Sequence, residues 1–169
     1  MKYQESLSFS HPALWVVLLP LSAFMGYGAV RQIIYDQPFG TNPAPDLWLL
    51  VFAGIPVLLL ALLLWARLRI SIDEEAVSYR FPPFHFKWHH IPWQEIEAAY
   101  VRKYRPIYEF GGWGLRINLR GNRAYNVMGD KGTGLEILRK DGKKILFSTR
   151  KPRQLRSFLD ELSSKGKPL

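Results

Sequence analysis

Cysteine is absent from the 169 residues of this chain. Its absence excludes disulfide bonds, thiol nucleophiles, and zinc or iron-sulfur sites held by thiolates. No nucleophile beside a base and no pair of carboxylates in a recognisable catalytic spacing stands out either. We therefore expect a non-enzymatic protein without a cofactor.

Charge is scarce in the first third of the chain and plentiful in the rest. The segment before Arg67 holds only two basic and three acidic side chains: Lys2, Arg31, Glu5, Asp36 and Asp46. The remainder carries 21 basic and 11 acidic residues, a net charge of +10. A basic domain is attracted to anionic surfaces, and the apolar first third favours lipid over nucleic acid as that surface.

The longest uncharged run, Leu47–Ala66, has the length of a membrane-spanning helix. Its 20 residues match the roughly 20 that cross about 30 Å of hydrocarbon. Trp48 and Trp65 lie near its ends, where indole rings favour the membrane interface, and Arg67 and Arg69 follow directly. We predict a transmembrane helix over residues 47–66.

A second apolar run begins at Ala13 and extends through Arg31 to Tyr35. A cleaved signal peptide is the competing interpretation, but Lys2 is offset by Glu5 and no small-x-small cleavage site closes the run. We predict a retained transmembrane helix over residues 13–35, preceded by an N-terminal tail over residues 1–12.

The segment between the runs, residues 36–46, contains three prolines with Gly40 and Asn42. This composition ends a helix and makes a short exposed loop, so the two runs form a helical hairpin. Two crossings leave both termini on one side, and the basic residues after the second run place that side in the cytoplasm. We expect a multi-pass protein of the cell membrane with an extracytoplasmic loop.

From residue 67 to the end, the sequence predicts one α+β domain. Apolar residues alternate in short runs, the pattern of half-buried strands, and the runs lie near residues 68–72, 77–81, 84–88, 96–104, 113–119, 124–128, 135–138 and 144–147. In the fifth run Leu115, Ile117 and Leu119 share one face, and Trp113 is expected in the core. Asp141-Gly142 predicts a tight hairpin with positive φ at both residues.

One amphipathic helix closes the chain, starting near Thr149 with Pro152 in its first turn. Leu155, Phe158 and Leu162 belong to its apolar stripe and require burial. About seven strands followed by this helix indicate a bent antiparallel sheet or open barrel whose open end the helix plugs.

Three segments carry a resemblance: Ile91–Ile96, Gly111–Gly114, and Lys143–Pro152 leading into the last helix. Together with the strand order, they resemble the bacterial pleckstrin-homology-like domains that a helical hairpin tethers to the inner membrane. The resemblance implies a PH-like fold and a role as an interaction module. The basic phosphoinositide motif of eukaryotic members has no clear match, so inositide binding is not expected.

Two motifs are better explained by structure than by ligand binding. His85, His89 and His90 could ligate a metal, but His85 and His89 lie roughly 13 Å apart along a regular strand, so we expect no metal site. The segment Gly129–Gly134 lacks the full phosphate-loop order and leads into a predicted strand; we interpret it as a turn with positive φ.

Two basic clusters are the candidate lipid-binding or partner-binding residues. The first contains Arg102, Lys103 and Arg105; the second contains Arg150, Lys151, Arg153 and Arg156. Each basic residue near an anionic leaflet contributes roughly 1 kcal/mol, although both clusters could also be solvated faces. Glu95, Glu97 and Glu109 are expected to form surface ion pairs.

These features predict a membrane-anchored interaction module whose domain binds a protein partner, a second copy of itself or anionic lipid at the cytoplasmic face. Nucleic acid is an unlikely partner for a tethered domain without a recognisable nucleic-acid motif. The alternative is an accessory subunit of a membrane transport or envelope-stress complex that acts through its transmembrane hairpin.

Overall fold

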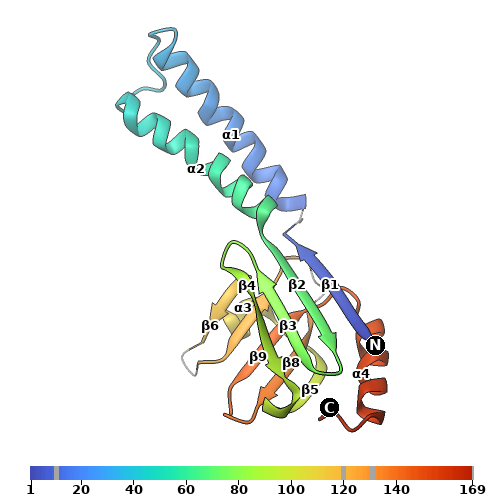
Figure 1. The fold of residues 1–169 in the computed structure, drawn as a ribbon. Coiled ribbons are helices and arrows are strands. Elements are labelled where there is room, and N and C mark those ends of the chain that lie inside the picture. The colour runs from blue at the N-terminus through green and yellow to red at the C-terminus, as the bar shows by residue number, and fades with distance from the viewer. Residues whose placement is uncertain (10–11, 119–120, 130–131, 169) are drawn as a thin grey trace. The chain divides into compact units, whose positions relative to one another are not determined.

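The computed structural model describes residues 1–9, 12–118, 121–129 and 132–168 as an α+β protein with two apolar helices and two sheets. The chain forms two compact units, and the helices make one of them. The other unit combines Met1–Phe9 with the chain from Ala66 onward. We call it the folded unit (Figure 1).

The helical unit consists of α1 (Pro12–Ile33) and α2 (Asp46–Trp65), with 22 and 20 residues. Both helices are long and apolar enough to cross a membrane. Only 6% and 11% of the residues in their most apolar windows are buried, whereas the core helix of a soluble protein would be mostly buried. The prediction of two apolar helices is therefore confirmed, with boundaries within two residues.

The turn between α1 and α2 is held by one ring and one amide. The Phe39 ring lies so close to Gly28 that an added Cβ would meet it at 2.6 Å, which only glycine avoids. The Gln32 amide nitrogen donates to the Ala44 carbonyl at 2.8 Å and to the Asp46 carboxylate at 2.7 Å. The two helices thus form a hairpin with an ordered polar turn.

The first sheet of the folded unit begins with a strand that the sequence did not predict. Residues expected as an N-terminal tail form β1, which pairs antiparallel with β2 from Lys2 opposite Asp73 to Ser8 opposite Arg67. Its inward positions are Tyr3, Glu5 and Leu7, and the carboxylate among them obscures the apolar alternation. The sheet has the order β1 (Lys2–Ser8), β2 (Arg67–Asp73), β3 (Ala76–Phe81) and β4 (His85–Pro92).

The second sheet contains five strands in the order β5-β8-β9-β7-β6, and β7 runs parallel to β9. The expectation of a purely antiparallel sheet is therefore wrong. A short 3₁₀ turn, η1 (Trp93–Glu95), leads into it from β4. Its strands are β5 (Ile96–Lys103), β6 (Gly114–Ile117), β7 (Arg123–Asn126), β8 (Thr133–Arg139) and β9 (Lys144–Ser148).

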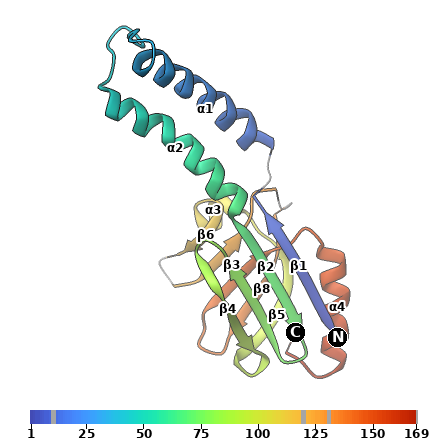
Figure 2. The same ribbon diagram turned by 45° about the horizontal axis from the view of Figure 1, so that its top comes forward.

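The core lies between the two sheets and under the last helix, α4 (Pro152–Ser164). In both ribbon views α4 runs beside β1 (Figures 1 and 2). Leu155, Leu159 and Leu162 are buried, and Phe158 packs against the Tyr3 ring at 5.8 Å. The predicted helix and the burial of its apolar stripe are confirmed, and the strands described here form two sheets and no closed barrel.

Two local predictions in the folded unit are wrong. Ile117 is 63% exposed and Trp113 lies outside the buried core, because β6 begins only at Gly114 and sits at the sheet edge; Leu119 is outside the described residues. In the β8–β9 hairpin only Gly142 has positive φ. The Arg139 N–H donates to the Lys143 carbonyl, which leaves Lys140, Asp141 and Gly142 as a three-residue loop in which one left-handed position suffices.

Candidate functional site

The outer face of the second sheet carries a hollow of about 410 Å³ beneath the short helix α3 (Pro106–Phe110). Phe110 packs there against a small cluster that includes Tyr104, Ala124 and Leu146. The sequence did not predict α3. It begins at a proline and ends at Gly111 with φ of 70°, the usual proline start and glycine stop of a helix.

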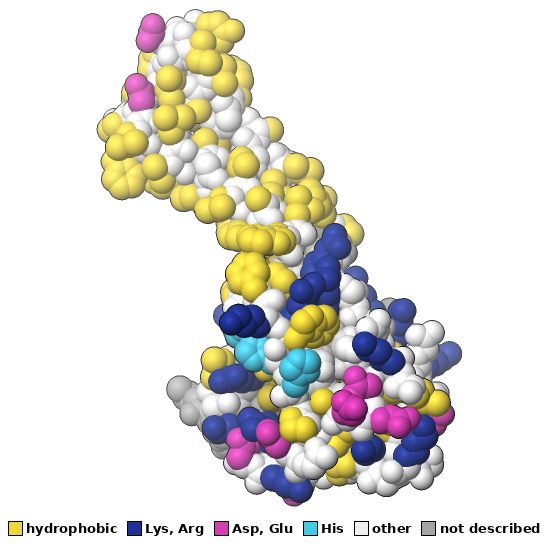
Figure 3. Space-filling model, in the orientation of Figure 1, with side chains coloured by type: hydrophobic (Ala, Val, Ile, Leu, Met, Phe, Trp, Pro, Cys, Tyr) yellow, Lys and Arg dark blue, Asp and Glu magenta, His cyan; other side chains and the backbone are white. Residues whose placement is uncertain are grey.

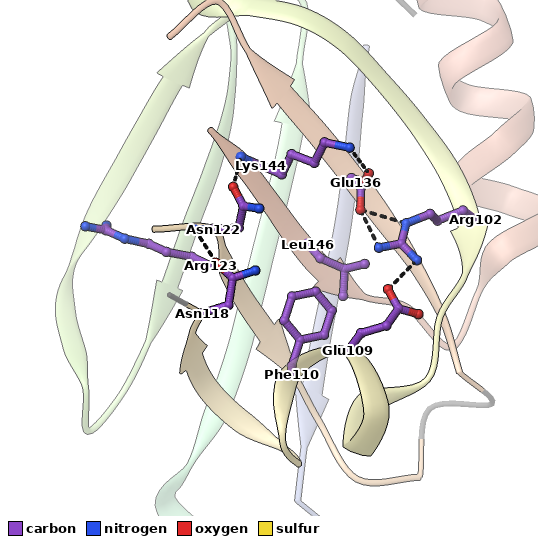
Figure 4. Close-up of a pocket in the computed structure, with 9 residues that line it drawn as sticks. All are labelled: Arg102, Glu109, Phe110, Asn118, Asn122, Arg123, Glu136, Lys144 and Leu146. Carbon is purple, nitrogen blue, oxygen red and sulfur yellow. Dashed lines mark hydrogen bonds and ion pairs between the residues drawn. The ribbon is translucent and has the colours of Figure 1, made fainter. Parts of the chain in front are cut away.

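A buried carboxylate, Glu136 on β8, is the centre of this hollow (Figure 4). The Tyr100 hydroxyl donates to it at 2.7 Å, and the Arg102 guanidinium donates through Nε at 2.6 Å. The Lys144 ammonium lies 3.6 Å from the same carboxylate, and Arg102 also pairs with Glu109 at 2.8 Å. β5, β8, β9 and α3 therefore meet in one ion-pair network.

The network controls ionisation at its centre. Burial acts to raise the pKa of Glu136, but the hydrogen bonds from Tyr100 and Arg102 and the charges of Arg102 and Lys144 outweigh it and leave the pKa below its usual range. The hydrogen bond to Glu136 in turn raises the pKa of Tyr100. Glu136 is thus ionised at neutral pH and accepts from several donors, which suits a structural role rather than proton transfer.

The amides that line the hollow also serve the backbone. Asn118 Oδ1 accepts from the Asn122 N–H, and Asn122 Oδ1 accepts from the Lys144 N–H, each at 3.0 Å. Arg123 points away from the other lining side chains in Figure 4. These bonds join Asn118 to Asn122 and Asn122 to the start of β9, and the described residues that line the hollow include no activated nucleophile.

The first basic cluster does not form one surface. Arg102 belongs to the Glu136 network, whereas Lys103 is exposed at the end of β5. The Arg105 guanidinium lies over the Tyr108 ring at 5.9 Å. The predicted ion pairing of acidic residues is confirmed for Glu109 with Arg102 and for Glu95 with Arg139, the latter at 2.9 Å.

The second basic cluster does come together, at the start of α4. Arg150, Lys151 and Arg153 line a shallow hollow of about 400 Å³ with Pro152 and Gln154. Lys151, Arg153 and Arg156 are exposed, and none of the three forms an ion pair with another described residue. The first turn of α4 contains no acidic residue, so the positive helix start adds to their potential.

Arg150 ties this cluster to the strand that precedes the helical hairpin. Its guanidinium donates to the Ser8 carbonyl at 2.9 Å and to the Met128 carbonyl at 3.3 Å. Ser8 ends β1 and lies four positions before Pro12, where α1 begins. The Arg150 side chain therefore reaches from the start of α4 to the end of β1, from which the chain continues to α1.

Glu5 is the residue of this region that sequence reasoning missed. Its buried carboxylate accepts from the Thr149 hydroxyl at 2.6 Å, the Arg150 N–H at 2.8 Å and the Tyr3 hydroxyl at 2.7 Å. A carboxylate from β1 thus positions the start of α4 across 145 residues of sequence. The one sequence pattern that could have predicted β1 is the alternation of Tyr3, Glu5 and Leu7, and the charged residue in the middle makes this pattern hard to recognise as a strand.

The histidines differ from the expectation of a regular strand. A register shift between Tyr79 and Phe81 brings the rings of His85 and His89 to 4.8 Å, far closer than the roughly 13 Å of a straight strand. Burial lowers the pKa of His85, and the nearby His89 and Arg123 act in the same direction. In the described part of the chain, no group of three histidine or carboxylate residues could hold a metal ion.

The glycine-rich segment before β8 behaves as a turn where it is described. Gly129 has φ of 90° and Gly132 has φ of 62°, and the chain continues directly into β8. Asp130 and Lys131 lie outside the described residues. The interpretation of this segment as a turn with positive φ is confirmed at both glycines.

Comparison with protein-family models and with curated proteins finds no match for this chain. Its function is therefore argued from the geometry of the folded unit and from the apolar helices.

Proposed function

We propose that this protein is a non-enzymatic interaction module anchored in a membrane by the α1–α2 hairpin, with the basic start of α4 docking on anionic lipid headgroups. One observation carries the proposal: the Arg150 guanidinium reaches Ser8, the last residue of β1, and the exposed Lys151 and Arg153 line the same hollow as Arg150. Chain continuity then keeps them near the bilayer.

The pairing of β1 with β2 supports an even number of crossings. Residues on both sides of the hairpin belong to one folded unit, so they lie on the same side of any membrane. Arg67 and Arg69 after α2 favour the cytoplasmic side. Cleavage of a signal peptide after α1 would remove β1 and with it Glu5, which argues for a retained helix.

The pleckstrin-homology-like fold suggested by the sequence belongs to the same proposal. Two packed sheets with a C-terminal helix at their margin support it, and the parallel pairing of β7 with β9 departs from an antiparallel meander. The resemblance would place the protein in the inner membrane of a bacterium. The resemblance supports an interaction module whether or not the start of α4 binds lipid.

Charge gives the expected size of the effect. Three exposed cations, Lys151, Arg153 and Arg156, should together contribute up to about 3 kcal/mol at an anionic surface, on the order of a hundredfold in the ratio of docked to undocked protein. Arg150 is left out of this set because it holds backbone carbonyls within the folded unit.

The test uses the full chain in lipid vesicles with a fluorophore on Gln154→Cys, an exposed and uncharged residue that lines the α4 hollow. Energy transfer to a dye on the lipid headgroups reports docking. We expect strong transfer in anionic vesicles at low salt, and weaker transfer in neutral vesicles, in high salt, or after Lys151, Arg153 and Arg156 are changed to Gln.

A matched control changes Lys140, Lys143 and Lys167 to Gln, which removes the same charge elsewhere on the folded unit. It should leave the transfer nearly unchanged. Equal losses in the two triple variants, or equal transfer in anionic and neutral vesicles, would rule out docking by the α4 cations and leave a protein partner or a second copy as the ligand.

A further inference from the structure

We infer that the turn between β3 and β4, together with the start of β4, is a second membrane contact, in which the Phe84 and Phe86 rings enter the interface of the same bilayer leaflet. This inference rests on the proposed crossing of the membrane by α2. It concerns a different part of the folded unit from the basic start of α4, and it depends on apolar transfer rather than on charge.

The β3–β4 turn is fastened to the end of α2 by a short stretch of chain. The helix ends at Trp65, and the Arg67 N–H, two residues later, donates to the Pro82 carbonyl at 3.3 Å. Two residues span at most about 7 Å. Wherever the membrane end of α2 lies, the Pro82 carbonyl is therefore within roughly 10 Å of it.

The same turn is joined to the strand that precedes α1. The Phe9 ring stacks on Phe81 with centroids 6.0 Å apart, and Phe81 contacts Phe84 at 5.2 Å. Phe9 lies three positions before α1 begins at Pro12. Both chain connections to the helical unit therefore leave the folded unit beside the base of Phe84.

The side chains on this turn are exposed although they are apolar. Phe84 and Phe86 are 56% and 59% exposed, whereas the inward residues of β3 are buried. Aromatic rings are favoured at the membrane interface, so two exposed phenylalanines near the end of a membrane-spanning helix suit that layer. Lys87 is exposed beside them and suits the headgroup layer.

The short distance between this turn and the end of α2 favours the bilayer as the partner of the two rings. The headgroup region adds about 5 to 7 Å to each side of the hydrocarbon, comparable to the reach of the two residues that follow α2. Rings that project from this turn meet that layer before any partner needs to be recruited. A second copy or another protein would have to displace lipid from a surface that the tether already brings against it.

The chain offers a clean labelling experiment because it contains no cysteine. Single cysteines at Phe84, Phe86, Lys140 and Leu58 carry a spin label in the full protein, reconstituted in neutral vesicles. Collisions with oxygen, which concentrates in lipid, are compared with collisions with a water-soluble nickel chelate. Lys140 lies in the β8–β9 turn, at the end of the strands away from Phe84, and Leu58 lies within α2.

We expect the ratio of oxygen to nickel collisions to be highest at position 58, several-fold above the Lys140 value at positions 84 and 86, and lowest at position 140. Equal ratios at 84, 86 and 140 with a high ratio at 58 would overturn this inference and leave the anchor intact. A low ratio at 58 would overturn both the anchor and the inference.

A second measurement tests the phenylalanine rings themselves, because the spin label stays at another position. A label on Lys87→Cys should show a ratio between those of positions 84 and 140. This ratio should fall when Phe84 and Phe86 become Ser, and should stay the same when both become Leu. The change should be the same in neutral and anionic vesicles, unlike docking through α4. An unchanged ratio in the Ser variant would show that proximity alone, not the aromatic rings, sets the depth.

Discussion

Glu136 is a buried carboxylate whose hydrogen bonds and ion pairs suit a structural role. The sequence predicted that Glu95, Glu97 and Glu109 form ion pairs on the surface. Glu136 was not predicted as an ion-pair residue, and its carboxylate is buried. Its partners come from β5 and β9, and no local spacing reveals contacts between strands that are distant in sequence. For the same reason, the sequence did not predict that the candidate residue Arg102 belongs to this network.

The ionisation of Glu136 gives a prediction about acid stability. Because its pKa in the folded protein is lowered, its contribution to stability is present above the ordinary pKa of glutamate and is lost as pH falls through the lowered value. Glu136→Gln should be less stable at neutral pH and should approach wild type in acid. Denaturant unfolding of the full chain in detergent micelles at several pH values measures this.

Glu97→Gln is the matched control, since Glu97 is exposed on the adjacent strand. It should change neither the neutral stability nor its pH dependence. The account of Glu136 fails if the stability difference between Glu136→Gln and wild type stays constant from neutral to acidic pH.

At the scale of elements, periodicity predicted what depends on local pattern. The two apolar helices and α4 follow from runs and stripes that are visible in sequence, and most strands of the folded unit follow from alternation. β1 and α3 were missed because a buried acid interrupts the first and only five residues make the second. The parallel pairing of β7 with β9 depends on long-range order, which alternation does not encode.

The packing of α4 predicts unequal effects for two aromatic residues. Phe158 packs on Tyr3 and the main core, so Phe158→Ala should cost about 2 kcal/mol, somewhat less than a fully buried phenylalanine. Trp113→Ala should cost less than about 1 kcal/mol, because Trp113 lies outside the core. Denaturant midpoints of the full chain test this, and a larger loss at Trp113 would contradict the packing.

At the scale of the whole molecule, β1 changes the meaning of the helical hairpin. A domain expected to begin at residue 67 instead includes Lys2–Ser8, so the hairpin is an insertion between two neighbouring strands. A fragment beginning at Arg67 lacks the strand that supplies Glu5 to the start of α4. Sequence patterns predicted both units, but only the strand pairing shows that the folded unit contains residues from both sides of the hairpin.

The distribution of surface types agrees with this division. In the face shown in Figure 3, hydrophobic side chains cover the helices and charged side chains gather on the folded unit. The second basic cluster was predicted from sequence, and three of its four members, Arg150, Lys151 and Arg153, line one hollow at the start of α4. Its position near Ser8 could not be predicted, because it depends on the unexpected strand.

The most direct test of the account is the sidedness of three single cysteines in intact cells: Gln4→Cys in β1, Thr41→Cys in the turn between α1 and α2, and Ser164→Cys at the end of α4. An impermeant thiol reagent should label position 41 in intact cells and should label positions 4 and 164 only after the cells are opened. If all three positions react alike, or if positions 4 and 164 react from opposite sides, the hairpin does not cross the membrane as this account requires.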